Sequence, residues 1–194
     1  MNYFMEKIIL IGGGGHCKSC IDVLKKINKF KIIGIIDNKI KINTKVLNYK
    51  IISNDKDLPL LRKKYKNALI TVGQIKSPKT RIKLFNLLQK YKFNMPAIIS
   101  KSCSLYKDSS IDKGTIIMNN SHIGPDVVIG KNCIINNKSL IEHDCKIGDH
   151  SHISTGAIIN GTVKIGRGTF IGSGTLFKIT SKLEITLLSM RVYT

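Results

Sequence analysis

A six-residue repeat runs through the second half of the chain and restricts what that half can fold into. Counted in steps of six from position 111 to position 171, all eleven positions are isoleucine. Neither a helix, with a period of 3.6, nor an alternating strand, with a period of 2, explains this spacing. A period of six is typical of a parallel β-helix, in which each hexad forms a short strand and a corner. The isoleucines are Ile111, Ile117, Ile123, Ile129, Ile135, Ile141, Ile147, Ile153, Ile159, Ile165 and Ile171.

Three hexads close one triangular coil, so the chain passes over itself every eighteen residues. The isoleucines then stack in columns and fill the core, with coils about 4.8 Å apart, as strands are in a sheet. The fourth place after each isoleucine holds a small or β-branched residue, which lets the corners close. Cys133 and Cys145 occupy this small inward place, and Cys103 fits the same series, so we expect no chemistry of them.

The first half has the pattern of an α/β domain. An apolar run at 7–11 leads into four glycines and His16, an amphipathic stretch follows to residue 27, and a second apolar run at 31–36 ends in Asp37. Strand, glycine loop, helix, strand and acid in this order are half of a nucleotide-binding βαβ unit. We expect further helices at 56–65 and from Ser77 and Pro78 to 91, and strands at 68–72 and 95–100.

The glycine loop supports two interpretations. Gly12 and Gly14 satisfy two places of the dinucleotide fingerprint, but Cys17 stands in the third. Such a loop can bring backbone N–H groups and a helix N-terminus to a phosphate, and Asp37 could then accept a ribose hydroxyl. Alternatively, the glycines only make a tight strand-to-helix turn.

The composition narrows the range of partners. The formal net charge is +20, but it comes from 28 Lys and only 4 Arg, and the chain has no Trp. Proteins that bind nucleic acids specifically rely on Arg and aromatic side chains, so we expect no nucleic-acid partner. The positive field should favour small anionic ligands.

The sequence shows no apolar run long enough for membrane insertion and no export signal, so a cytoplasmic protein is expected. Cys17 and Cys20 form a C-x-x-C pair, which is either a redox or metal motif or two small residues on a helix; the second reading is favoured because no other pair accompanies it.

Several segments together resemble bacterial hexapeptide-repeat sugar acetyltransferases that carry an N-terminal nucleotide-sugar-binding domain. That family includes the UDP-4-amino-sugar N-acetyltransferases of bacillosamine synthesis and the sialic-acid O-acetyltransferases. The similarity runs from about residue 6 to 175. The segments that carry it are Gly12 to His16, Asp37, Ile141-Glu142-His143-Asp144-Cys145 and Gly148-Asp149-His150-Ser151-His152.

The resemblance implies a Rossmann-like nucleotide-sugar-binding domain at 1–98 and a left-handed parallel β-helix acyltransferase domain at 99–178. It also implies a homotrimer that uses acetyl-CoA as co-substrate and needs no metal. In this family the general base falls on His143 and the acid that orients it on Asp144. Substrate contacts fall on Gly12, Gly13, Gly14, Gly15, His16, Asp37 and Asn136, and acetyl-CoA contacts on His152 and Gly161. We expect His122 and His150 to be exposed corner residues.

The predicted function is transfer of an acetyl group to the 4-amino group of a UDP-amino-sugar, in the synthesis of surface glycans or glycoprotein sugars. Two alternatives stay open: O-acetylation of a sialic- or legionaminic-type sugar, and a paralogue with little activity that only binds a nucleotide-sugar. The last alternative comes from residues 179–194, where the hexad pattern is lost. We expect a truncated or poorly ordered tail there, and weak acetyl-CoA binding as a result.

Overall fold

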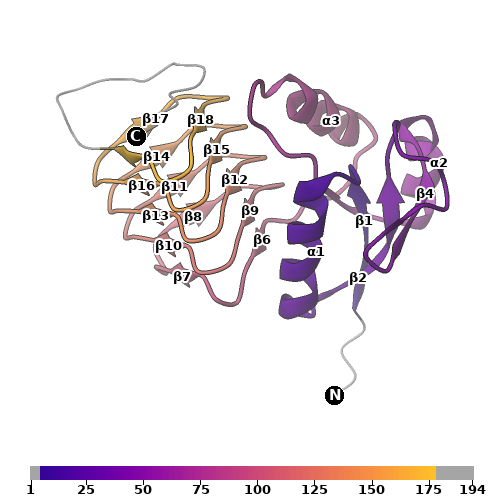
Figure 1. Ribbon diagram of the computed structural model, residues 1–194, viewed down its shortest axis with the longest axis horizontal. Helices are drawn as coiled ribbons and strands as arrows, with labels where there is room; N and C mark the ends of the chain where they lie inside the picture. The colour runs from indigo at the N-terminus through magenta and orange to yellow at the C-terminus, as the bar shows by residue number, and fades with distance from the viewer. Residues whose placement is uncertain (1–4, 178–194) are drawn as a thin grey trace. The chain divides into compact units, whose positions relative to one another are not determined.

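A computed structural model describes residues 5–177 of the chain (Figure 1). The expectations for the tail at 179–194 therefore lie outside the described residues. The chain divides into two compact units: the first holds the residues up to 73 together with 80–96, and the second holds 74–79 and the residues from 97 onward. The short segment at 74–79 thus leaves the first unit and packs with the second.

The first unit is built on a five-stranded sheet with the order β3-β4-β2-β1-β5. All neighbouring strands run parallel except β3, which is antiparallel to β4. The runs rich in isoleucine become the two central strands because both faces of such a strand are buried. The strands are β1 (Glu6–Ile11), β2 (Phe30–Ile36), β3 (Lys45–Val46), β4 (Tyr49–Ser53) and β5 (Asn67–Ile70).

Three helices and a short 3-10 turn complete this unit. The first helix presents Cys17, Cys20, Ile21, Val23 and Leu24 on its buried face. The third presents Arg81, Leu84, Phe85 and Leu88, and the last three of these pack into the same core as residues of β1 and β5. The elements are α1 (Gly15–Ile27), η1 (Asp55–Asp57), α2 (Leu58–Lys64) and α3 (Lys79–Lys90).

The second unit is a parallel β-helix with two-residue strands stacked in three sheets, as the hexads predicted. Strands eighteen residues apart pair in register, for example Ile123 with Ile141 and Ile141 with Ile159. The isoleucines of the ladder from 117 to 171 are buried and fill the core. Ile111, the first of the series, is only partly buried and packs against this core.

We name the sheets by their strands. The first sheet contains β7 (Ser104–Leu105), β10 (His122–Ile123), β13 (Leu140–Ile141), β16 (Ile158–Ile159) and β19 (Leu176–Phe177). The second contains β8 (Ser110–Ile111), β11 (Val128–Ile129), β14 (Lys146–Ile147) and β17 (Lys164–Ile165). The third contains β6 (Ile98–Ile99), β9 (Ile116–Ile117), β12 (Ile134–Ile135), β15 (His152–Ile153) and β18 (Phe170–Ile171).

The corners of the coils share one backbone conformation. Every sixth residue has a positive φ between 55° and 73°, which turns the chain from one sheet to the next. Glycine, Asn and Asp adopt this conformation most readily, but three corners use other residues. The corner residues are Gly114, Asn120, Asp126, Asn132, Lys138, Asp144, His150, Gly156, Thr162, Gly168 and Gly174.

Candidate active site

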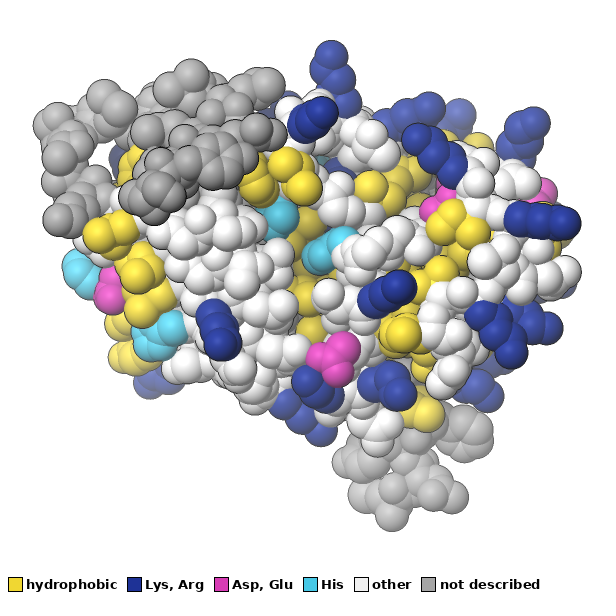
Figure 2. Space-filling view, viewed as in Figure 1, with side chains coloured by type: hydrophobic (Ala, Val, Ile, Leu, Met, Phe, Trp, Pro, Cys, Tyr) yellow, Lys and Arg dark blue, Asp and Glu magenta, His cyan; other side chains and the backbone are white. Residues whose placement is uncertain are grey.

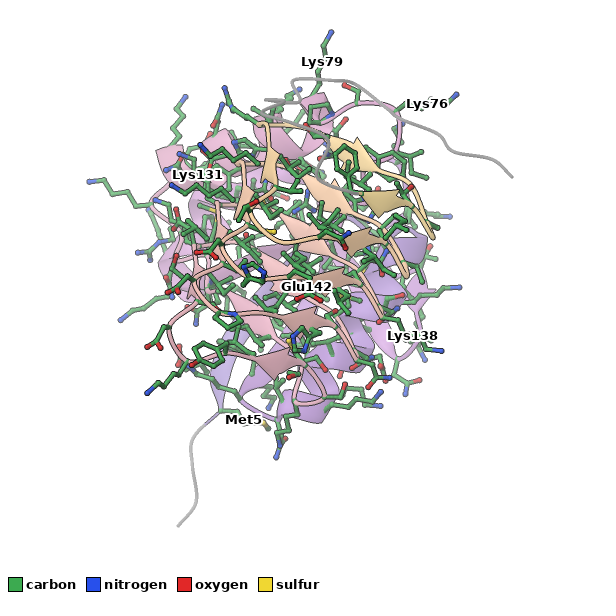
Figure 3. All side chains as sticks on the ribbon, turned by 90° about the vertical axis from the view of Figure 1, so that its left-hand side faces the viewer. Met5, Lys76, Lys79, Lys131, Lys138 and Glu142 are labelled. Atoms are coloured by element: carbon green, nitrogen blue, oxygen red, sulfur yellow. The ribbon has the colours of Figure 1, made fainter. Side chains whose placement is uncertain are left out.

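His143 and Asp144 form a pair on the corner that follows β13. The His143 Nδ1 lies 2.8 Å from Asp144 Oδ2, and the two side chains are 57% and 56% exposed. Because a carboxylate only accepts hydrogen bonds, Nδ1 carries the proton, and Nε2 of the neutral ring keeps a lone pair. Asp144 reaches the ring because it is itself the corner residue, with a φ of 59°. Figure 3 faces this side of the β-helix, with Glu142, the residue before His143, labelled near the middle.

Gly161 lies beneath the His143 ring, one coil further along the β-helix. A β-carbon at position 161 would stand 2.5 Å from His143 Nε2 and 2.6 Å from Cε1. The backbones meet at the same place, since the Thr162 amide donates to the His143 carbonyl at 2.8 Å. The absence of a side chain at Gly161 is therefore what lets the imidazole lie there.

A second cluster surrounds His152 on the third sheet. Its Nδ1 lies 2.5 Å from the carbonyl oxygen of Gln74, its Nε2 lies 3.3 Å from Asn136 Nδ2, and its ring packs on Phe170. A carbonyl only accepts, so Nδ1 donates to Gln74 and Nε2 accepts from the Asn136 amide. His152 is 6% exposed, and both ring nitrogens are occupied. It is therefore poorly placed to take a proton from a substrate, whereas His143 has a lone pair on an exposed ring.

The expectation that His150 is an exposed corner residue is wrong. Its side chain is 1% exposed, and its Nδ1 lies 2.9 Å from Asn132 Nδ2. The cause is the segment at 74–79, which covers this corner: Gln74 Nε2 donates to the His150 carbonyl at 2.8 Å, and Pro78 packs against Gly168. His122, by contrast, is exposed, as expected.

The predicted nucleotide site lies at the carboxyl ends of β1 and β2. Gly12 has a φ of 106°, and a β-carbon there would stand 2.3 Å from Val72 Cγ2, so only glycine fits. Gly14 and Gly15 are exposed, with no atom within 4 Å of an added β-carbon. The N-cap of α1, Gly14, has no side-chain hydrogen bond. An anion can therefore reach the N-terminus of α1 at the exposed Gly14 and Gly15.

Asp37 holds this loop in place. Its Oδ2 accepts from the Gly13 amide at 2.7 Å, and its Oδ1 accepts from the amides of Lys39 and Ile40 at 2.7 and 3.0 Å. Partial burial raises the pKa of the Asp37 carboxyl, but these hydrogen bonds and the nearby Lys39 charge outweigh it, and the pKa lies below its ordinary value.

Cys17 and Cys20 lie on α1, and both are buried. Burial raises the pKa of the Cys17 thiol to about 11, despite a hydrogen bond with Thr71 that lowers it. A thiol in this state is a poor nucleophile and metal ligand. Within residues 5–177 no three His, Cys, Asp or Glu side chains gather as a metal site, and no helix is long and apolar enough to cross a membrane.

The predicted site residues thus form three groups. His143, Asp144 and Gly161 lie together at one corner of the β-helix, and Asn136 and His152 lie together on its third sheet. The glycine loop, His16 and Asp37 lie in the first unit. The sequence analysis missed Gln74, because its contacts with His150 and His152 join residues more than seventy positions apart and leave no local pattern.

Comparison with known protein families recognises both halves of the chain. Residues 7–88 match the PglD N-terminal domain, and residues 108–143 and 144–178 match the bacterial transferase hexapeptide, a unit of six repeats. The chain belongs to the bacterial hexapeptide-repeat transferases and carries a PglD-type N-terminal domain. This confirms the resemblance and the acyltransferase class predicted from the sequence. The comparison with curated proteins found no match to this chain.

Solved structures of sugar acetyltransferases share the fold. One is a histidine-to-alanine mutant of GDP-perosamine N-acetyltransferase from Caulobacter crescentus with CoA and GDP-perosamine: identity is 23%, coverage 91% of this chain and 90% of that one, and the TM-score 0.76. Another is the acetyltransferase domain of PglB from Neisseria gonorrhoeae with acetyl coenzyme A, at 19% identity, 90% and 93% coverage and a TM-score of 0.74. WeeI from Acinetobacter baumannii has 18% identity, 90% and 94% coverage and a TM-score of 0.52.

Proposed function

We propose that the protein transfers the acetyl group of acetyl-CoA to the 4-amino group of a UDP-activated amino-sugar, with His143 as general base. The observation that carries this proposal is the pair of His143 Nδ1 and Asp144 Oδ2 at 2.8 Å, which leaves the Nε2 lone pair of an exposed ring for a substrate proton. Two of the similar structures are mutants of one histidine in an N-acetyltransferase, which supports a histidine in this role.

The reaction needs one proton acceptor and no covalent enzyme intermediate. The sugar amine attacks the thioester carbon, so that a C–N bond forms and, as the tetrahedral intermediate collapses, the C–S bond to CoA breaks. His143 Nε2 takes the proton that the amine loses, and the Asp144 carboxylate stabilises the imidazolium that results. The same proton then passes to the CoA thiolate as it leaves.

The two units have different roles in the proposed reaction. We propose that residues 1–98 bind the nucleotide-sugar, through the exposed backbone of Gly14 and Gly15, through His16, and through the loop that Asp37 fixes. Residues 99–178 perform the transfer. Asn136 contacts the sugar, and His152 and Gly161 contact acetyl-CoA.

In one chain, His143 lies at a corner while His152 lies on the third sheet, so an intersubunit site is the arrangement that can use both. We therefore propose a homotrimer, and the cytoplasmic location predicted from the sequence remains part of this proposal.

A thiol-release assay tests the reaction and its acceptor. Purified protein is incubated with acetyl-CoA and, in separate reactions, UDP-4-amino-sugars, GDP-perosamine and free nonulosonic acids, and CoA release is followed with a thiol reagent. Release only with a UDP-amino-sugar supports the proposal. Release with GDP-perosamine corrects the nucleotide, and release with a nonulosonic acid favours O-acetylation. No release with any acceptor contradicts the proposed activity.

A further inference from the structure

A buried arginine in the first unit has no part in the mechanism above. Arg81, on α3, is 1% exposed and is among the largest fully buried side chains of the described chain. Its Nη1 donates to the carbonyls of Ile70 and Val72 at 3.2 and 2.7 Å. A buried guanidinium is costly to desolvate, so its position calls for a physical reason.

The contacts of Arg81 lie at the open edge of the sheet. Among residues 5–177, the strand β5 ends the strand order, and no further strand covers its outer side. At its beginning, that side pairs with Asn94, whose carbonyl accepts from the Ala68 amide at 2.9 Å. At the end of β5, the Arg81 side chain supplies the hydrogen bonds that a neighbouring strand would otherwise make. It can reach both carbonyls because carbonyls two residues apart in a strand point to the same side.

The segment that Arg81 holds forms a wall of the glycine loop. The Thr71 hydroxyl donates to the Gly12 carbonyl at 2.6 Å, and the Thr71 amide donates to the Ile11 carbonyl at 2.8 Å. Val72 fills the space where Gly12 lacks a side chain, and a β-carbon on Gly73 would lie 3.4 Å from His16 Cβ. The carboxyl ends of β1 and β5 therefore meet here, at the edge where open parallel sheets bind their ligands.

We infer that Arg81 is a positioning residue for the nucleotide diphosphate. By holding residues 70–73 against Gly12 and His16, it fixes the loop whose backbone amides bind the phosphates. This inference rests on the proposed function in one respect, namely that the loop binds a nucleotide. The residue touches no reacting atom, so it acts on binding and leaves the transfer step alone.

Calorimetry of the full-length protein with UDP and with GDP measures this effect. For the nucleotide that the wild type binds, Arg81→Gln raises Kd at least tenfold, and Arg81→Lys, which keeps the charge without the planar fork, raises it less. The kcat at saturating sugar and the Kd for CoA change less than threefold. The matched control is Arg62→Gln, since Arg62, on α2, also donates to a carbonyl, that of Lys92, but this hydrogen bond is exposed. An Arg81→Gln protein that binds the nucleotide within twofold of wild type overturns the inference.

Hydrogen exchange separates this inference from the proposed function. The Gly12 amide donates to the Ile36 carbonyl and the Gly13 amide to Asp37, so both amides report on the loop without any ligand. We expect their exchange to be at least tenfold faster in Arg81→Gln than in Arg62→Gln. Unchanged amide exchange in Arg81→Gln refutes the positioning role, whether or not the wild type binds a nucleotide. Failure of the wild type to bind any nucleotide, in contrast, contradicts only the proposed function.

A milder variant covers the case in which Arg81→Gln does not fold. Thr71→Val keeps the shape of the side chain and removes the hydrogen bond to the Gly12 carbonyl, together with the one to the Cys17 thiol. Residues 70–73 are then held less firmly against the glycine loop. We therefore expect the Kd for the nucleotide and the exchange rate of the Gly12 amide both to rise at least threefold. No change in either quantity counts against the path from Arg81 to the loop.

Discussion

The imidazole of His143 lies directly against the α-carbon of Gly161, with no room for a β-carbon between them. Backbone hydrogen bonds between stacked coils hold these two residues in register. The His143 ring therefore packs on backbone, which cannot move aside as a side chain can. The resemblance implied a contact between Gly161 and acetyl-CoA. The structure adds a second reason for glycine, which is the orientation of His143.

Gly161→Ala should therefore lower kcat by about 100-fold, because the methyl group displaces the His143 ring and a shift of about 1 Å in a reacting group can cost this much. Steady-state thiol release measures kcat, and thermal unfolding shows whether the coil survives. Lys164→Ala, at an exposed position on the next strand, serves as control. Full activity of Gly161→Ala would contradict the placement of the base.

His143→Ala should lower kcat by about 10²–10⁴, the contribution of a positioned general base. His122→Ala is the matched control, because His122 is an exposed histidine on the same sheet, and it should keep wild-type activity. If His143→Ala retains more than about a third of the wild-type kcat, the residue is not the base.

Asp144→Asn should lower kcat by at least about tenfold, since the amide is a weaker partner for the imidazolium. Asparagine adopts a positive φ as readily as aspartate, so the corner itself is preserved. Asp126→Asn is a close control, since Asp126 occupies the same corner one coil earlier with a φ of 55°. Equal loss in both variants would indicate damage to the corners instead of loss of the carboxylate.

The β-helix was predictable because its core imposes one rule on every hexad. Each isoleucine must point inward, so a period of six appears in the sequence and returns as the in-register pairs of the structure. The strand, loop and helix around Gly12 were predictable for a similar reason, although α1 begins at Gly15, two residues before the expected amphipathic stretch.

Features set by long-range contacts were not predictable. The burial of His150 depends on Gln74, 76 positions away, and no local pattern indicates it. The hairpin of β3 and β4 was missed because Leu47, at its turn, has a φ of 52°, which leucine rarely adopts. The sequence also did not indicate that the Asp37 carboxylate accepts from three backbone amides, and its expected contact with a ribose stays a prediction.

Asp37→Asn should lower the melting temperature at neutral pH, by about 2–4 °C if about 1 kcal/mol is lost in a protein of this size. The folded-state pKa of Asp37 is lowered, so its stabilisation is fully present above the ordinary value and is lost as the pH falls through the folded-state pKa. The gap between the variant and wild type should therefore narrow below about pH 4. Thermal unfolding across pH measures it, with exposed Asp108→Asn as control. A gap that does not depend on pH would exclude the carboxylate as its source.

The first sheet of the β-helix exposes apolar side chains next to the proposed base. Ile158 and Leu176 are neighbours on β16 and β19 and are 36% and 52% exposed, and Leu140 pairs with Ile158 three residues before His143. Figure 2 shows hydrophobic side chains beside histidines and acidic groups at the left edge of the molecule. We expect this column of apolar side chains to form the interface of the proposed homotrimer.

We therefore expect light scattering to give three times the chain mass of 21.6 kDa. Replacing Ile158 and Leu176 together with lysine should shift the protein to monomers, because three copies of each charge would be buried at the interface. Activity should fall with assembly although His143 is unchanged, since the proposed site combines His143 of one copy with His152 of another. Leu60→Lys, at a residue 57% exposed on α2, should leave both mass and activity unchanged. If the double variant is monomeric and still fully active, one chain holds a complete site and the proposed intersubunit site is wrong.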